Sequence, residues 1–144
     1  STLDDVFSLE NRLRLADINE VKALGSNPRR ALLMGYIYSD ECLTVWEGDK
    51  VIGMFGVSSW ELPKGFATIW FLGSIECTNH PVTFVKEGLK YTKEKLLKYD
   101  ILVNCVDARN TYSLRWLKAI GMKLSSPIFH NGYEFIQFYK VKGV

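Results

Sequence analysis

Histidine and cysteine are scarce in this chain, which limits the metal and thiol chemistry that it can carry. Only His80 and His130 are present, and the three cysteines, Cys42, Cys77 and Cys105, lie far apart without the spacing of a zinc site. We therefore expect no metal site, and free, partly buried thiols of the kind typical of a reducing cytoplasm. A catalytic cysteine needs a histidine partner, and the short separation of Cys77 and His80 indicates one only weakly.

Long apolar runs and a strong net charge are also missing. No segment approaches the roughly 18 consecutive apolar residues of a membrane span. The opening segment, Ser1–Asp5, is polar and lacks the basic and apolar regions of a signal peptide. The formal net charge is +2, too small to indicate a nucleic-acid or membrane partner. We expect a cytoplasmic protein with neither kind of partner.

The composition is that of a globular protein, with 47% apolar and 24% charged residues in a chain of 144. That length is sufficient to bury a substantial core. The sequence contains no internal repeat, low-complexity tract or linker, so a single domain over residues 1–144 is the simplest prediction.

Three short helices are predicted at the start of the chain. Thr2 and Asp5 have the spacing of a capping box ahead of an apolar run. Asp17 and Glu20 repeat that signature, which predicts a second helix start. Asn27-Pro28 is typical of the cap and first position of a third helix.

The hydrophobic pattern then changes to that of strands. Segments Leu43–Glu47 and Val51–Trp60, joined by the turn Gly48-Asp49, predict an antiparallel hairpin. Phe66–Leu72 is almost continuously apolar, which predicts a strand buried on both faces in the middle of a sheet.

Pro81 opens the longest predicted helix. Its expected core-facing stripe consists of Val82, Val85, Leu89, Leu96 and Tyr99. Its basic side carries Lys86, Lys90, Lys93, Lys95 and Lys98. A nucleic-acid groove is one interpretation of these lysines, but Glu87 and Glu94 interrupt the charge and favour a solvated face.

The remaining elements complete a β-α-β unit and a second hairpin. Ile101–Val106 predicts a buried strand after a right-handed crossover. Asn110 caps a short helix that Gly121 ends, and Asn131-Gly132 predicts a tight hairpin turn before the alternating run Tyr133–Val141. The fold class is therefore α/β (α+β), with a mixed central sheet.

The element order and one short motif resemble the GNAT superfamily of N-acetyltransferases. Asn110, Ser113 and Gly121 fall at the spacing of that family's helix motif, while Met122 replaces a phenylalanine and Leu117 stands where tyrosine is common. The resemblance implies the acyl-CoA N-acyltransferase fold. It also implies acetyl-CoA as co-substrate and direct attack by an amine acceptor, without a metal or a covalent enzyme intermediate.

A closer resemblance is to small GNAT-like proteins encoded among the virion genes of short-tailed bacteriophages. The stretches that carry it are Met54–Val57, Trp70–Ser74, Val106–Asn110 and Ser113–Leu117. It implies a role in the virion or its assembly, and the host cytoplasm as location. Such relatives usually begin with one more strand, so a trimmed chain or a shortened sheet edge is expected.

The coenzyme A phosphates are held in this family by a glycine-rich loop before the long helix. The corresponding segment here, Gly73–Pro81, has one glycine and places Glu76 where phosphates would lie. The side chains expected to bind the anion are Ser74, Thr78 and Asn79.

The resemblance also implies a wedge between two strands that receives the pantetheine arm. Its expected lips are residues 71–73, with Phe71, Leu72 and Gly73, and residues 105–108, with Asp107. Main-chain groups of Leu72 or Gly73 would hold the thioester oxygen. Arg109 is the candidate phosphate partner, and Asn110 and Ser113 are candidate contacts of the pantetheine arm.

Proton transfer has several candidates. Tyr112 and Tyr133 are expected near the site as acids in place of the missing tyrosine. The base is sought among Glu76, Glu61 and Asp107.

A non-catalytic role is the second hypothesis, favoured by the altered phosphate segment and by Leu117. In that case the chain would bind a phage or host protein, and Trp60 and Phe129 are candidate exposed contacts. The acceptor amine stays open. A homodimer formed by strand addition at an unpaired terminal strand is a further expectation.

Overall fold

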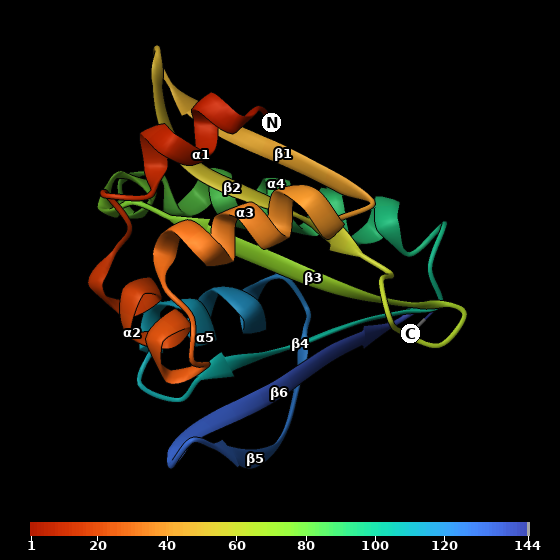
Figure 1. Ribbon diagram of the computed structural model, residues 1–144. Coiled ribbons are helices and arrows are strands. Elements are labelled where there is room, and N and C mark those ends of the chain that lie inside the picture. Colours follow the sequence, from red (N-terminus) through yellow and green to blue (C-terminus); the bar gives the residue numbers. More distant parts are fainter. Residues whose placement is uncertain (144) are drawn as a thin grey trace.

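Residues 1–143, which the computed structural model describes, fold around a six-stranded mixed sheet with helices on both faces (Figure 1). The strand order is β1-β2-β3-β4-β6-β5, with β1 Glu41–Glu47, β2 Lys50–Ser58, β3 Phe66–Gly73, β4 Ile101–Asp107, β5 Lys123–His130 and β6 Tyr133–Val141. The helices are α1 Leu3–Leu9, α2 Leu15–Ala23, α3 Pro28–Tyr38, α4 Pro81–Lys95 and α5 Thr111–Ala119, with a 3-10 turn η1 at Ile75–Asn79. The predicted fold class and element order are confirmed.

Most local signals in the sequence have the predicted effect. Thr2 and Asp5 form the reciprocal capping box of α1, and Asn27 accepts a hydrogen bond from the third residue of α3. Asn110 caps α5 in the same way. The hairpin turn Asn131-Gly132 has φ angles of 51° and 80°, the left-handed conformation that such turns require.

The central position of β3 is also confirmed. Helices α1 and α3 pack on one face of the sheet and α4 covers the other (Figure 1). Successive side chains of a strand point to opposite faces. Trp70 and Leu72 accordingly pack with the core under α1 and α3, whereas Ala67 and Ile69 pack with the core that includes Leu102.

The predicted capping role of Asp17 and Glu20 is wrong. Helix α2 begins at Leu15, after Arg14, which makes no side-chain capping bond. Asp17 and Glu20 lie inside the helix, and both carboxylates accept hydrogen bonds from main-chain N–H groups of the sheet. A capping signature reflects local spacing only, and tertiary partners compete for the same oxygens.

The predicted inner stripe of α4 is confirmed at Val85, which packs against the core that includes Leu117, and is wrong at Val82 and Leu89. Val82 and Leu89 are 80% and 42% exposed, and helix α4 ends before the buried Leu96 and Tyr99. Two large aromatic side chains of α4 face the sheet instead: Phe84 packs on Phe71 and Tyr91 on Phe55. Aromatic rings bury more apolar area than valine or leucine, so they determine which side of the helix turns inward.

Strands β3 and β4 run parallel and then separate. Their ladder joins Phe66–Thr68 to Ile101–Val103, and in the described chain it extends no further. β3 continues beside β2 to Gly73, and β4 continues beside β6 to Asp107. The two strands diverge toward α2 and α5 (Figure 1), which matches the wedge expected from the sequence.

The sheet ends at β1 and β5, so a homodimer formed by strand addition at either edge stays a prediction. Among the helices of residues 1–143, none combines the length and apolarity that crossing a membrane requires.

Gly56 lies where β2 approaches the main chain of β1. A Cβ atom at this position would overlap the carbonyl oxygen of Glu41 in the paired strand, and that backbone cannot move without breaking the ladder. We expect Gly56→Ala to lower the free energy of unfolding by about 3 kcal/mol, measured by urea denaturation. The control is Gly48→Ala, in the open β1–β2 turn with φ of +61°, for which about 1 kcal/mol is expected. Equal losses in the two variants would contradict the close approach.

Candidate active site

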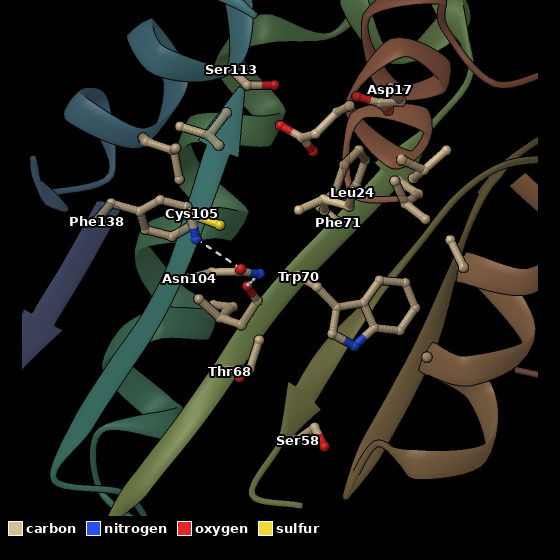
Figure 2. A pocket seen from close by; sticks show the side chains of 18 of the residues that line it. Asp17, Leu24, Ser58, Thr68, Trp70, Phe71, Asn104, Cys105, Ser113 and Phe138 are labelled. Atoms are coloured by element: carbon tan, nitrogen blue, oxygen red, sulfur yellow. Dashed lines mark hydrogen bonds between the residues drawn. The ribbon is translucent and has the colours of Figure 1, made fainter. Parts of the chain in front are cut away.

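The divergence of β3 and β4 opens a cavity of about 390 Å³, bordered by α2, α3, α5 and the two strands. Figure 2 shows Asp17 and Ser113 at one end of this wedge cavity, Ser58 and Thr68 toward the other, and Trp70, Phe71 and Asn104 between them. Most of the lining is apolar, and its acidic and basic side chains are Arg14, Asp17 and Glu20. All three come from α2 or the residue before it.

Arg14 and Asp17 form a buried ion pair at the end of β3. The guanidinium donates to both carboxylate oxygens, at 2.9 Å to Oδ1 and 3.1 Å to Oδ2 through Nη2. Asp17 Oδ2 also accepts the N–H of Gly73 at 2.9 Å, and the main-chain N–H of Arg14 donates to the Gly73 carbonyl at 2.9 Å. Both main-chain groups of Gly73 are therefore bonded to the start of α2.

Glu20 makes the equivalent contact with the other strand. Its Oε1 accepts the N–H of Asp107, the last residue of β4, at 2.7 Å. Burial raises the pKa of Glu20 to about 7, and the neighbouring carboxylates of Asp17 and Asp107 act in the same direction. Since Glu20 also lines the cavity, it can accept and release a proton there near neutral pH.

Asn104 closes the inner end of the wedge (Figure 2). Its Nδ2 donates to the carbonyl of Ile69 on β3 at 2.8 Å, and its Oδ1 accepts the N–H of Cys105 at 2.7 Å. One side chain thus replaces the ladder bond that the diverging strands can no longer make. The cavity beyond Asn104 is the part of the wedge that stays open.

The main chain of Phe71 faces this open part. Main-chain groups two residues apart in a strand point the same way. The carbonyl of Ile69 and the N–H of Gly73 both point into the gap, toward Asn104 and Asp17, so the groups of Phe71 do as well. Of the main-chain donors expected at the thioester oxygen, Gly73 is already bonded to Asp17, and Leu72 by the same alternation points toward β2.

The expected phosphate segment folds as the compact turn η1 rather than as an open loop. Thr78 donates its hydroxyl hydrogen to the carbonyl of Ile75 at 2.7 Å, and Glu76 pairs with Lys50 at 2.5 Å. The hydrogen bond from Lys50 lowers the pKa of Glu76 to about 2. The predicted residues of this segment lie outside the cavity lining: Ser74, Glu76, Thr78 and Asn79.

Asp107, Arg109 and Tyr133 form a cluster on the outer side of the second lip. Arg109 donates to Asp107 Oδ2 at 2.6 Å and lies 4.8 Å from the centre of the Tyr133 ring. These hydrogen bonds from Arg109 hold the pKa of Asp107 below its usual value. Neither Arg109 nor Tyr133 belongs to the cavity lining.

The start of α5 lies beside the ion pair of α2. Asn110 is 3% exposed and accepts the N–H of Ser113 at 3.2 Å. The ring centre of Tyr112 is 5.5 Å from the guanidinium of Arg14. Of the predicted site residues, the structure therefore brings Phe71, Leu72, Tyr112 and Ser113 together in the lining, with Gly73, Asp107 and Asn110 bonded directly to it.

An aromatic cluster joins α4 to α5 behind the wedge. Trp116 Nε1 donates to the carbonyl of Phe84 at 3.0 Å, and both rings pack against Phe71, at centroid distances of 5.8 and 5.6 Å. The sequence did not indicate this cluster, because its members come from three separate elements.

Arg14, Asp17 and Glu20 were also missed as site residues. One signal was available: a three-residue spacing places them on one side of a helix, beside the buried Val21. Charged residues on the apolar side of a helix are costly and indicate either a buried ion pair or a functional site.

Comparison with known proteins gives a fold and no close relative. No protein-family model and no curated protein matches the sequence. A Bacillus subtilis acetyltransferase solved in complex with CoA matches with a TM-score of 0.64 and 17% identity, over 98% of this chain and 93% of that one. A GNAT-family acetyltransferase from Bacillus anthracis matches with a TM-score of 0.70 and 14% identity, over 99% and 92%. A ribosomal-protein-alanine N-acetyltransferase from Brucella melitensis matches with a TM-score of 0.65 and 12% identity, over 98% and 96%.

These likenesses establish that the chain has the GNAT acetyltransferase fold. Within residues 1–143 no group of three or more His, Cys, Asp or Glu side chains is placed to hold a metal ion.

The raised pKa of Glu20 makes stability depend on pH. Between the ordinary value of 4.5 and about 7 the folded chain binds the Glu20 proton more tightly than the unfolded chain does. The stabilisation that this proton gives is therefore lost as pH rises through that interval. We expect the free energy of unfolding of Glu20→Gln, relative to that of the wild type, to rise by up to about 3 kcal/mol between pH 5 and pH 8.

Urea denaturation at the two pH values measures this difference. Glu76→Gln is the control, because the pKa of Glu76 is about 2 and its carboxyl does not titrate in the interval. A Glu20→Gln effect of equal size at pH 5 and pH 8 would show that Glu20 has an ordinary pKa.

Proposed function

We propose that this chain transfers an acetyl group from acetyl-CoA to the amino group of an acceptor. The observation that carries the proposal is the splayed β3–β4 pair with Glu20 in the cavity between the strands. Acyl transfer to an amine needs a slot for the thioester arm and a base whose pKa lies near neutrality, and the wedge supplies both. The GNAT fold of the matched structures supports the same function.

Acetyl-CoA supplies the activated acetyl thioester, and the wedge fits its pantetheine arm. An extended chain can add to the unpaired side of β3 through main-chain hydrogen bonds. We assign the N–H of Phe71 as the donor to the thioester oxygen, in place of Leu72 and Gly73. Asn110 and Ser113 border the same gap from α5 and are the proposed contacts of the arm.

The turn η1 fits the pyrophosphate poorly. The Glu76 carboxylate adds negative charge in front of α4, and Pro81 removes one N–H donor from the first turn of that helix. Ser74, Thr78, Asn79 and Arg109 are kept as candidate contacts of the nucleotide end. We therefore expect the affinity to come mainly from the pantetheine arm.

We assign the base to Glu20 instead of Glu76. Glu76 is paired with Lys50 and has a pKa of about 2, so it does not take up protons at neutral pH. The acceptor enters as an ammonium and gives one proton to Glu20, and the neutral amine nitrogen then forms the C–N bond to the carbonyl carbon. The C–S bond breaks with its electron pair on sulfur. Tyr112 lines the cavity and is the proposed acid that protonates sulfur; it takes up the second proton that the nitrogen loses, and the third stays on the amide nitrogen. Tyr133 lies outside the lining.

Calorimetric titration tests the wedge. We expect acetyl-CoA to bind with a Kd on the order of 0.1 mM, about −5.5 kcal/mol, and pantetheine to keep most of that affinity. Glu76→Gln should tighten acetyl-CoA about threefold and leave pantetheine unchanged, because only the nucleotide carries phosphates. Asn110→Ala should weaken both ligands. Failure of both ligands to bind the folded wild-type chain would reject the acyl-CoA proposal.

The pH dependence of turnover tests the base. We expect kcat/KM to show a break near pH 7, measured through release of the coenzyme A thiol, because Glu20 must be ionised to accept the amine proton. Glu20→Gln should lose about 100-fold or more in kcat/KM, together with the break. Glu76→Gln is the matched control and should keep both the wild-type kcat/KM and the break near pH 7. Wild-type turnover in Glu20→Gln would assign the base elsewhere.

A second candidate function has a specific observation in its favour. The N–H groups of Gly73, Cys105 and Asp107, which face the gap, are already bonded to side chains of this chain. A GNAT-like protein that no longer binds coenzyme A would have its wedge filled in this way. The role in a phage particle, or in binding a phage or host protein, belongs to this alternative. Absence of acyl-CoA binding, together with a protein partner recovered from virions, would favour it.

A further inference from the structure

The wedge cavity continues from Glu20 toward α3, and its walls there are apolar and aromatic. They are formed by Met34, Gly35 and Tyr38 of α3, Trp70 of β3, and Trp60 in the segment after β2. Because side chains alternate along β3, Trp70 projects to the α3 side of the sheet and Phe71 to the α4 side. The part beside Trp70 therefore lies across β3 from the α4–α5 face, and we call it the aromatic chamber.

Trp70 is held in one orientation. Its Nε1 donates to Ser39 Oγ at 2.8 Å, so the polar atom of the indole is already satisfied. A Cβ atom on Gly35 would lie 2.6 Å from the ring, so the indole rests directly on the backbone of α3. Figure 2 shows the ring extending from β3 toward that helix. A fixed indole is a preorganised wall for a flat apolar group.

The rim of the chamber carries a second aromatic surface. Tyr38 and Trp60 stack at a centroid distance of 4.3 Å with an interplanar angle of 29°. They are 38% and 51% exposed, so both line the chamber and reach solvent. A ligand entering from this side meets aromatic rings from the rim inward.

The charge of the lining selects one cation. Arg14 and Asp17 neutralise each other in their ion pair, which leaves Glu20 as the unbalanced charge among the lining residues. Among the described residues, those that line the chamber include no carboxylate that could pair with another ammonium group. The guanidinium of Arg14 is bonded to Asp17 through Nε and Nη2, so its charge is already balanced and a ligand carboxylate would add a further uncompensated negative charge beside Glu20.

We infer that the acceptor is a primary amine joined by a short alkyl chain to an aromatic ring, with its nitrogen at Glu20 and its ring beside Trp70. This inference rests on the proposed function and specifies its acceptor. Polyamines are disfavoured because a second ammonium would be buried in the chamber without a partner. Amino acids and acidic amines are disfavoured because their carboxylate would also be buried in the chamber without a partner.

Binding of amines without acetyl-CoA is the first experiment. We would titrate the chain, by calorimetry, with 2-phenylethylamine, tryptamine, hexylamine, spermidine and 3-phenylpropanoate. The two arylalkylamines should bind, hexylamine should bind about tenfold more weakly because it lacks the ring, and the other two should not bind. Tighter binding of spermidine or hexylamine than of either arylalkylamine would overturn the inference, as would the absence of arylalkylamine binding.

Variants locate the ring site. Trp70→Leu should weaken the binding of 2-phenylethylamine about tenfold. Trp70→Phe keeps an aromatic ring and fills more of the indole's space than leucine does, so it should weaken binding about threefold or less. Trp46→Leu is the matched control, since Trp46 is 53% exposed on β1 and lies outside the chamber lining. Equal affinity in Trp70→Leu, Trp46→Leu and the wild type would place the ring elsewhere and overturn the inference.

Acetyl transfer to the same amines separates the inference from the function on which it rests. Transfer with the highest kcat/KM for an arylalkylamine supports both. Transfer that prefers spermidine or hexylamine rejects the aromatic acceptor and keeps the acetyltransferase. Binding of arylalkylamines without any transfer keeps the amine site and rejects the acetyltransferase.

Discussion

Two hydrogen bonds hold the wedge in its observed form: Gly73 N–H to Asp17 and Asp107 N–H to Glu20. Each ties the end of one diverging strand to the same short helix. Parallel strands that separate lose their ladder partners, and buried main-chain donors without partners are costly. Helix α2 supplies the missing acceptors from two carboxylates that are three residues apart. The separation of β3 and β4, and the cavity between them, therefore depend on this helix.

This arrangement requires buried charge, and only one of the two carboxylates has a full counter-ion. Asp17 is paired bidentately with Arg14, which also bonds Gly73 through its main chain. Glu20 accepts one hydrogen bond, from the N–H of Asp107. The guanidinium of Arg109 donates to the side chain of Asp107 and not to Glu20. Burial raises the pKa of both carboxyls, and the charge of Arg14 acts against burial at both. Glu20, which accepts no hydrogen bond from a cationic side chain, reaches a pKa of about 7.

The sequence predicted the elements better than it predicted the site. Helix caps at Thr2, Asn27 and Asn110 and the Asn131-Gly132 turn are local signals, and each has the expected geometry. Asp17 and Glu20 carried a local signal as well, but their partners lie 56 and 87 residues away, and spacing alone cannot reveal such contacts. Glu76 was chosen as a base because of its place in a family loop, whereas its proton affinity is determined by Lys50 from β2.

A wedge with occupied donors is compatible with acyl transfer because the occupied and the available groups alternate along β3. Gly73 N–H is bonded to Asp17 and Ile69 C=O to Asn104, and the main chain of Phe71 lies between them, facing the gap. The two bonded positions fix the edges of the gap without filling it. A purely structural role for α2 would need acceptors for two N–H groups, which neutral side chains supply equally well. A carboxyl whose pKa is near 7 costs stability at neutral pH, and the proposed role of Glu20 in proton transfer would account for that cost.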